Sequence, residues 1–266
     1  MASRRLRCYA RWVLLGIDHL VIAVRDLDDA ADELERCVGL AATGGGRHPK
    51  LGTQNRLVWL ADSYVELVSI ADPGTAEGSW LGVPTIAALE RGGGLATWAI
   101  ATDSIDADVA ALREIGAGFD DPTPGERVRP DGAVVRWRLA IGGALGPAEP
   151  PFLIQHEASS AEWTERDRAT RSAEHHPIGG PVRLEVLELP VADAQTAGRI
   201  LSRATELRFR PSLAGGGARD ADLGRQIVRL RPTHGTQVRP GIGLASPAGD
   251  GRSVNALGCR WTVRQV

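Results

Sequence analysis

The apolar pattern of residues 16–24 returns at residues 94–102, and this repetition restricts the possible folds more than any other feature. In both stretches the residues alternate with a period of two, as in a strand. Each stretch leads into a segment whose apolar residues recur at spacings of three and four, as on one face of a helix. The sequence therefore predicts an internal repeat of about 80 residues.

The first copy of the repeat, residues 16–70, has the order β-α-β-β-β. Asp26 and Asp28 offer N-cap oxygens for the helix, and Gly39 is expected to end it as a C-cap. A Gly-rich turn follows the helix and leads into the remaining strands. Two of these strands read as a hairpin, at residues 56–60 and 64–70.

The later segments repeat this order less completely. The second copy is expected to end with a strand at residues 152–155, and a linker of acidic and basic residues follows at residues 158–181. A strand, a helix and another strand can be traced through residues 182–230. We therefore expect paired modules over residues 16–157 and a partial third module over residues 182–266.

Residues 1–15 are basic and end in a brief apolar run. This run is shorter than a secretory h-region and lacks a clear cleavage site, and no run in the chain approaches a membrane span. We expect a loosely ordered extension, with a weak surface-binding arm as the alternative.

The composition limits the kinds of partner. A hydrophobic content of 43%, a charged content of 24% and a net charge of −2 are ordinary for a globular protein and give no broad electrostatic reason to bind nucleic acid or an anionic membrane. The three cysteines, Cys8, Cys37 and Cys259, form no C-x-x-C pair, so a reducing cytoplasm fits better than a disulfide framework. Nucleotide-binding loops and the G-x-S-x-G nucleophile motif are absent.

Five sequence segments indicate a known superfamily: GIDHLVIAVRDLDDAA, GGRHPKLGTQN, YVELVSI, PFLIQH and HHPIGG. Through these segments, the chain resembles the glyoxalase-like domain proteins of the vicinal oxygen chelate superfamily, and the resemblance covers residues 16–190. The resemblance implies an α+β fold, in which tandem βαβββ modules form a curved, cup-shaped mixed sheet with helices outside. This superfamily hosts many chemistries, so the activity has to be argued from the site.

The resemblance also implies a divalent metal ion in the cup, held by residues of the first and fourth strands of each module. In the first module these are His19 and Glu66, whose imidazole and carboxylate suit zinc, iron, manganese or nickel. The second module offers Thr97, a poor ligand, and Gln155, a neutral amide. The predicted metal ligands are His19, Glu66 and Gln155. With a register slip of one residue, His156 replaces Gln155.

His48 is the most suggestive loop residue, because it follows a run of glycines and an imidazole can move protons near neutral pH. His48 and Glu66 are the predicted catalytic residues. Thr53 and Asn55 either face the cup or only satisfy turn backbone, and Arg47 either clamps an anionic group or stays in solvent. The predicted substrate-binding residues are polar or aromatic: Arg47, Thr53, Asn55, Trp59, Tyr64 and Thr97.

Two functions remain open from the sequence, beside a third interpretation as a degenerate structural scaffold. The first is a metal-dependent enzyme, a lyase, isomerase or dioxygenase, that acts on a small oxygen-rich substrate. The second is a metal-free protein of the bleomycin-resistance type that sequesters an apolar or aromatic ligand against Trp59, Trp98 and Tyr64. In both cases the expected partner is a small molecule, without nucleic acid or membrane, and the protein is expected to be a cytoplasmic monomer or homodimer.

Overall fold

The computed structural model describes residues 14–172, 176–233 and 238–266. Most of the expected N-terminal extension, residues 1–13, lies outside this part of the chain. Among the helices of the described residues, none is both long enough and apolar enough to cross a membrane.

The first module consists of five elements in the predicted order β-α-β-β-β. β1 and β4 run parallel and side by side, and β3 runs antiparallel to both β2 and β4. Residues of the first and fourth strands are therefore neighbours in space. The elements are β1 (Gly16–Ala23), α1 (Leu27–Val38), β2 (Thr43–His48), β3 (Thr53–Trp59) and β4 (Tyr64–Ile70).

Helix α1 begins and ends at residues suited to cap it. The Asp26 carboxylate accepts hydrogen bonds from the backbone N–H groups of Asp28 and Asp29, which have no partner inside the helix. Gly39 follows the last turn with a φ of 81°, a left-handed conformation that glycine adopts without strain. The predicted C-cap is confirmed, and of the two predicted N-cap residues Asp26 is the one that caps.

The second module repeats the first. Gly16 and Gly94 open equivalent strands, and Leu27 and Ile105 begin equivalent helices, so equivalent residues lie 78 positions apart (94 − 16 and 105 − 27). Two short helices connect the modules. The elements are α2 (Pro73–Ala76), α3 (Gly82–Glu90), β5 (Gly94–Ala101), α4 (Ile105–Glu114), β6 (Thr123–Val128), β7 (Val134–Ala140) and β8 (Phe152–His156).

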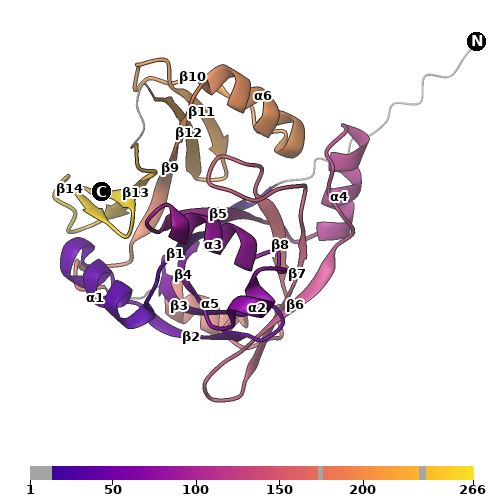
Figure 1. Cartoon of the computed structure of the whole chain (residues 1–266). Coiled ribbons are helices and arrows are strands. Elements are labelled where there is room, and N and C mark those ends of the chain that lie inside the picture. Colours follow the sequence, from indigo (N-terminus) through magenta and orange to yellow (C-terminus); the bar gives the residue numbers. More distant parts are fainter. Residues whose placement is uncertain (1–13, 173–175, 234–237) are drawn as a thin grey trace, which may run out of the picture.

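The eight strands of the two modules close into a barrel in the order β1-β4-β3-β2-β6-β7-β8-β5. β1 and β5 pair antiparallel at one seam, and the pairing of Arg47 with Val128 joins β2 to β6 at the other. Figure 1 shows these strands as a ring, with α1 and α4 outside it. The predicted α+β fold with a curved mixed sheet is confirmed, and the cup is closed all round.

The C-terminal third forms a second sheet that repeats the barrel's strand order with one strand fewer. Its order is β10-β11-β12-β9-β13-β15-β14. β9 lies parallel to β12 and antiparallel to β13, as β1 lies to β4 and β5, and β15 runs parallel to β13 as β8 does to β5. Among the described residues no strand takes the place of β6, so this sheet stays open.

The segment expected as a partial third module thus contains one full β-α-β-β-β succession and three strands of another. After the short helix α5 (Glu165–Ser172), its elements are β9 (Arg183–Val191), α6 (Ala194–Thr205), β10 (Arg210–Pro211), β11 (Arg219–Leu223), β12 (Gln226–Pro232), β13 (Gly241–Ser246), β14 (Ser253–Ala256) and β15 (Cys259–Gln265).

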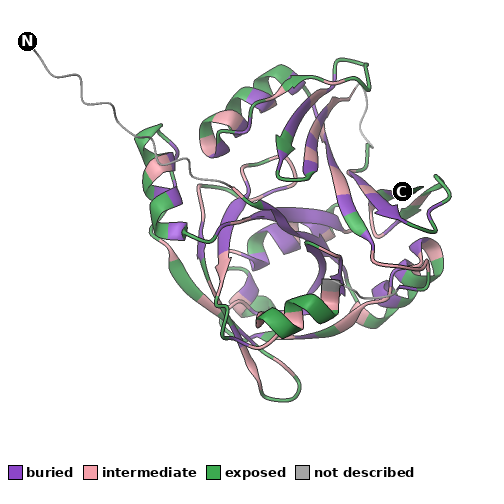
Figure 2. Ribbon diagram, turned by 180° about the vertical axis from the view of Figure 1, so that it is seen from behind, coloured by how far each residue is buried: buried purple, intermediate pink, exposed green. Residues whose placement is uncertain are grey.

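The largest apolar cluster lies outside the barrel, where α1 and the second sheet pack against it. Leu20 and Ile22 of β1 join this cluster together with Trp261 of β15. Figure 2 shows that the strands of the ring are largely buried, whereas exposed residues gather on the helices and loops. Because successive strand residues point to opposite faces, His19 and Val21 point into the barrel instead.

Candidate functional site

The barrel encloses a small cavity in which polar residues of the first module meet aromatic rings. His19, His48, Asn55 and Glu66 come from four adjacent strands and are at most 6% exposed. The cavity volume is about 30 Å³, room for one or two water molecules. Aromatic side chains make up much of the remaining wall: Trp59, Tyr64, Trp80, Trp137, Phe152 and Trp163.

Glu66 lies between two imidazole rings. Its Oε2 atom is 3.6 Å from His19 Nε2, and its Oε1 atom is 3.8 Å from His48 Nε2. Both separations are too long for hydrogen bonds. The Asn55 amide, in contrast, donates a hydrogen bond of 2.6 Å to Glu66 Oε1. The structure thus brings these four predicted residues together around one buried carboxylate.

Asp18 orients His19 although the two residues are adjacent in the sequence. A register shift between Ile17 and His19 in the β1–β5 pairing interrupts the alternation of the strand. As a result, Asp18 Oδ1 lies 2.7 Å from His19 Nδ1 and 3.0 Å from His156 Nε2. Burial raises the pKa of Asp18, but the hydrogen bonds and charges of His156 and His19 lower it well below its ordinary value. Asp18 is therefore ionised and accepts from both rings.

This arrangement fixes the tautomer of His19. With its Nδ1–H donated to Asp18, the Nε2 atom of His19 carries a free lone pair that faces Glu66. A carboxylate behind an imidazole is the arrangement that orients histidines in metal sites and raises their basicity.

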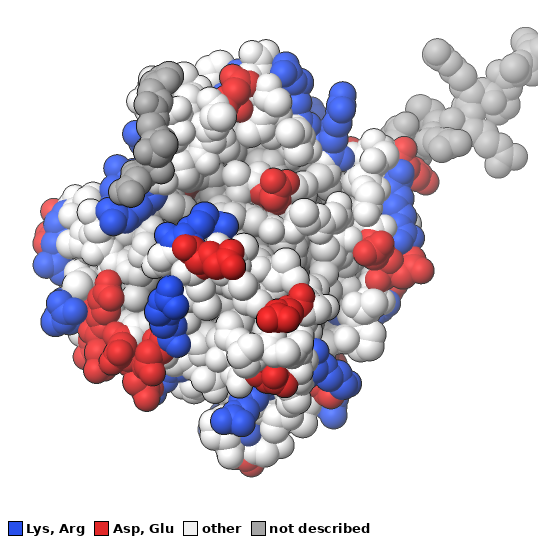
Figure 3. Space-filling model, viewed as in Figure 1, with Lys and Arg blue, Asp and Glu red and all other residues white. Residues whose placement is uncertain are grey.

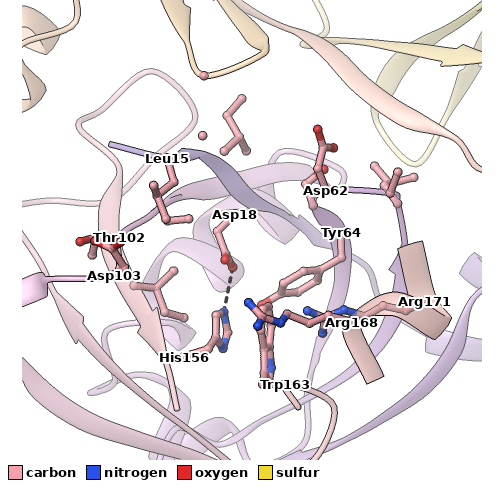
Figure 4. A pocket seen from close by; sticks show the side chains of 18 of the residues that line it. Leu15, Asp18, Asp62, Tyr64, Thr102, Asp103, His156, Trp163, Arg168 and Arg171 are labelled. Atoms are coloured by element: carbon pink, nitrogen blue, oxygen red, sulfur yellow. Dashed lines mark hydrogen bonds and ion pairs between the residues drawn. The ribbon is translucent and has the colours of Figure 1, made fainter. Parts of the chain in front are cut away.

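His156 closes one end of the cavity. Its Nε2–H donates to Asp18, and its buried Nδ1 atom has no partner. Its ring stacks on Trp163 with centroids 3.3 Å apart. Burial lowers the pKa of His156 despite the opposing charge of Asp18, so the ring is neutral at neutral pH. Figure 4 shows the Asp18–His156 pair, with Tyr64, Trp163 and two arginines of α5 on one side of it.

His48 is also a neutral imidazole. Its Nδ1 atom lies 3.0 Å from the Thr53 hydroxyl, and its ring meets the ring of Trp137 edge to face. Burial lowers the pKa of His48 to about 4, since the charges of Arg127 and His19 oppose the attraction of Glu66. When Nδ1 donates to Thr53, His48 Nε2 presents an unprotonated nitrogen to the cavity.

Residues 158–172, expected as part of a linker, cover this end of the barrel. Glu162, which has a φ of 68°, pairs with the buried Arg127 of β6. The next residue, Trp163, then reaches His156. Trp59, Tyr64, His156 and Trp163 line both the inner cavity and a cleft of about 1020 Å³ outside it. These four rings therefore form the partition between cleft and cavity.

The outer cleft lies between the barrel mouth and the second sheet. Gln226 of β12 forms part of its wall and accepts a hydrogen bond from the backbone N–H of Ile17. Arg168, Arg171 and Arg225 line the cleft together with acidic residues of the barrel. On the face that Figure 3 shows, acidic and basic residues are interspersed, so that face carries no broad surface of one sign.

Gln155 does not face the cavity, which corrects the predicted ligand set. Its Oε1 atom accepts a hydrogen bond from the backbone N–H of Ile105, and its Nε2–H donates to the Asp103 carbonyl. Gln155 therefore holds the start of α4, while the next residue, His156, points inward. This is the alternative that a shift of one residue along the strand provides.

The strand pairing also shows which residue stands at the position of Glu66 in the second module. Val21 pairs with Glu66 in the first module, and its equivalent Ala99 (21 + 78) pairs with Phe152. Phe152 therefore replaces the carboxylate, and Thr97 (19 + 78) replaces His19. Thr97 is buried with an unpartnered hydroxyl, but it is not among the residues that line the cavity. The second module supplies no ligand at these two positions.

The remaining predicted residues divide between the two faces of the barrel. Arg47 is exposed and points away from the cavity, because the neighbouring His48 points inward. Thr53 is buried against His48, and Trp59 and Tyr64 line the cavity.

A divalent metal ion was predicted, and the residues suit one in kind, although only His19 and Glu66 supply strong ligands. Among the described residues, no three His, Cys, Asp or Glu side chains are arranged as a metal site. His19 and Glu66 are nevertheless good ligands, their facing atoms are close to the roughly 3 Å that separates two ligands of one ion, and the amide oxygen of Asn55 is buried without a partner. The donor set therefore fits an ion that binds by two strong protein ligands and a neutral oxygen.

Several residues of this region were not predicted from the sequence. Asp18 was hidden by the irregular pairing of β1, and Arg127 lies in a strand that carries no clear pattern. Trp163 had one signal, an aromatic residue within a highly charged linker. Arg171 had none.

A family model described as "Glyoxalase-like domain" matches residues 17–205 of the chain. Among solved structures, a hypothetical protein from Staphylococcus aureus is similar with a TM-score of 0.78 and 16% identity, covering 94% of this chain and 99% of that chain. At this identity the likeness concerns the fold alone.

Two methylmalonyl-CoA epimerase structures are similar over about half of the chain. One is from Streptomyces coelicolor in complex with 2-nitronate-propionyl-CoA, with a TM-score of 0.41, 23% identity and coverage of 56% of this chain and 99% of that chain. The other is from Mycobacterium tuberculosis, with a TM-score of 0.40, 20% identity and coverage of 59% and 92%. No curated protein sequence matches the chain.

Proposed function

The chain belongs to the glyoxalase-like domain family, and from this premise we propose that it is a divalent-metal-dependent enzyme that moves a proton on a small oxygen-rich substrate. The observation that supports this most is the convergence of His19 Nε2, His48 Nε2 and the Glu66 carboxylate in one buried cavity. Such a cluster carries a high desolvation cost unless it binds something.

His19 and Glu66 would hold the ion, with Asn55 as a neutral third donor. When bound, the ion supplies a Lewis acid that polarises substrate oxygens and stabilises negative charge developing on them. Asp18 keeps the lone pair of His19 Nε2 directed into the cavity. A site with few protein ligands leaves positions open for the two oxygens of a substrate.

His48 would take the proton. Its imidazole is neutral at neutral pH, and Thr53 holds the ring so that Nε2 faces the same space as Glu66. A base must stand within hydrogen-bond reach of the proton that it removes. The cavity has room for one or two water molecules, so only the reacting end of a substrate would lie between His48 and Glu66. There it would meet this condition, and the same nitrogen can return the proton, which supports an isomerase or lyase reaction. The surrounding rings exclude water from the charged intermediate.

The direct test is metal analysis of protein purified without an affinity tag. We expect a stoichiometric divalent ion that is lost in His19→Ala and Glu66→Gln and kept in Arg47→Ala, the exposed control on β2. Full occupancy in His19→Ala would remove this assignment.

The metal-free alternative, a ligand-sequestering protein, is favoured by one observation: Thr97 and Phe152 stand where the second module would supply ligands. It predicts that the tag-free protein takes up no ion after dialysis against zinc, manganese or nickel. An aromatic ligand would then quench the tryptophan fluorescence of the unmetallated protein.

A further inference from the structure

Three aromatic rings at the barrel mouth form the walls of an open box. Trp59 and Tyr64 lie 5.1 Å apart with planes inclined by 56°, and Trp163 stands 6.4 Å from Trp59 and 6.2 Å from Tyr64 with inclinations of 75° and 61°. Rings inclined in this way direct their faces toward a common space. We call these three residues the aromatic box.

The guanidinium of Arg171 lies over two faces of this box. Its Cζ atom is 3.8 Å from the ring centroid of Trp163 and 4.6 Å from that of Trp59. Arg171 Nη1 also donates a hydrogen bond of 2.7 Å to the carbonyl of Glu162. Among the described residues, no carboxylate lies within ion-pair distance of Arg171. Within residues 14–172, 176–233 and 238–266, ring faces and one carbonyl are therefore what contacts this cation in place of a counter-ion.

Burial lowers the pKa of Arg171, and the ring faces and acidic residues around the box act in the opposite direction, in favour of positive charge. The face of an aromatic ring attracts a cation, and the attraction strengthens when the cation is withdrawn from water. The ionised Asp18 stands behind the box and acts favourably on the charge of Arg171 at longer range, as does Glu162. The neutral phenol of Tyr64 completes the wall, since burial raises its pKa well above the ordinary value.

We propose that the box of Trp59, Tyr64 and Trp163 is a binding subsite for an organic cation of the guanidinium type, and that Arg171 occupies it as an internal substitute. The box opens on the outer cleft of about 1020 Å³ and forms part of its partition from the inner cavity. A ligand in the cleft therefore places its cationic group in the box when α5 withdraws Arg171. This inference needs neither the metal ion nor Glu66, so it stands or falls separately from the proposed function.

Arg171→Ala empties the box and allows a direct test by chemical rescue. Methylguanidinium chloride, at concentrations below those that denature the protein, is titrated into the full-length variant while tryptophan fluorescence and thermal unfolding are followed. We expect a saturable fluorescence change and a rise in Tm, with an apparent affinity at least tenfold tighter than in the wild type. N-methylurea, a neutral molecule of almost the same shape, is expected to have no effect, and neither is sodium chloride at equal ionic strength.

Two variants make the result specific. Arg166→Ala removes an exposed arginine of the same helix that does not line the cleft, and it is expected to titrate like the wild type. Trp163→Ala in the Arg171→Ala background is expected to abolish the saturable change. Equal affinities in Arg171→Ala and wild type, or equal binding of N-methylurea, would overturn the proposal. If Arg171→Ala does not fold, Arg171→Met retains an unbranched apolar side chain and is compared in the same way.

Discussion

His19 Nε2 faces Glu66 Oε2 at 3.6 Å inside the barrel, and the two residues come from the first and fourth strands of one module. Their equivalents in the second module are Thr97 and Phe152, which carry no charge. The two halves of the barrel therefore share a backbone but differ in chemistry: the first supplies the imidazole–carboxylate pair, and the second supplies apolar and aromatic wall together with His156 and Arg127. The following expectations come from this asymmetry.

Asp18→Asn should weaken metal binding without removing a ligand. The variant removes the negative charge that fixes the tautomer of His19, and comparable changes behind metal-bound histidines cost roughly 10- to 100-fold in affinity. Competition with a chromogenic chelator measures the change. Asp28→Asn, on the exposed start of α1, is the matched control. Unchanged affinity in Asp18→Asn would show that this carboxylate does not position His19 for a metal.

Glu162→Gln should destabilise the fold strongly. Arg127 is 4% exposed and pairs with Glu162, so the variant leaves a buried guanidinium whose pairing is weakened. Removing one partner of a buried pair typically costs about 3 to 5 kcal/mol of unfolding free energy. Urea unfolding measures this. Asp106→Asn, which breaks the exposed pair between Asp106 and Arg138, should change the midpoint little.

The stability of the fold should decrease as the pH falls from 6.5 to 4. His48 has a pKa of about 4 in the folded state against an ordinary value of 6.5, so within this window the unfolded chain binds a proton that the folded chain does not. The unfolding free energy then falls by up to about 3 kcal/mol as the pH is lowered. Urea unfolding at several pH values shows the slope, and His48→Gln should flatten it. An equally steep slope in His48→Gln would assign the effect to other groups, such as His156.

Gln155→Ala should affect the start of α4 and not the metal. Ser104, the N-cap residue of α4, makes no side-chain capping hydrogen bond, and Gln155 accepts from the first N–H of the helix in its place. Loss of a cap costs about 1 kcal/mol. Metal content should stay at the wild-type level. A loss of metal in this variant would return Gln155 to the ligand set.

The architecture of the first module could be predicted because local signals agree there. The caps of α1, the alternation in β1 and the hairpin of β3 and β4 all indicate the same elements. The resemblance to a known family added the closure of two modules around one site. His19 and Glu66 followed from these two sources together.

The other parts of the site depend on strand pairings and tertiary contacts that cannot be read from the periodicity of the sequence. The loop between β7 and β8 differs in length from its counterpart in the first module, so the alignment of the two modules selected Gln155 and left the inward position of His156 as the alternative. The irregularity at Asp18 breaks the period-two rule that predicted the faces of β1. Residues 158–172 read as part of a linker of acidic and basic residues, and only tertiary contacts place Trp163 and Arg171 against the barrel.

The second sheet lacks a counterpart of β6, and the absence of this one strand among the described residues separates an open sheet from a closed barrel. Glu188 on that sheet forms ion pairs with Arg231 and Arg260, and both arginine side chains are more than 40% exposed to solvent. In the barrel, the carboxylate of Glu66 is buried and faces the imidazoles of His19 and His48. Glu188 and Glu66 are equally buried, so the closed ring determines what each carboxylate faces: Glu66 faces imidazoles in an enclosed cavity, whereas Glu188 in the open sheet is neutralised by arginines that reach solvent.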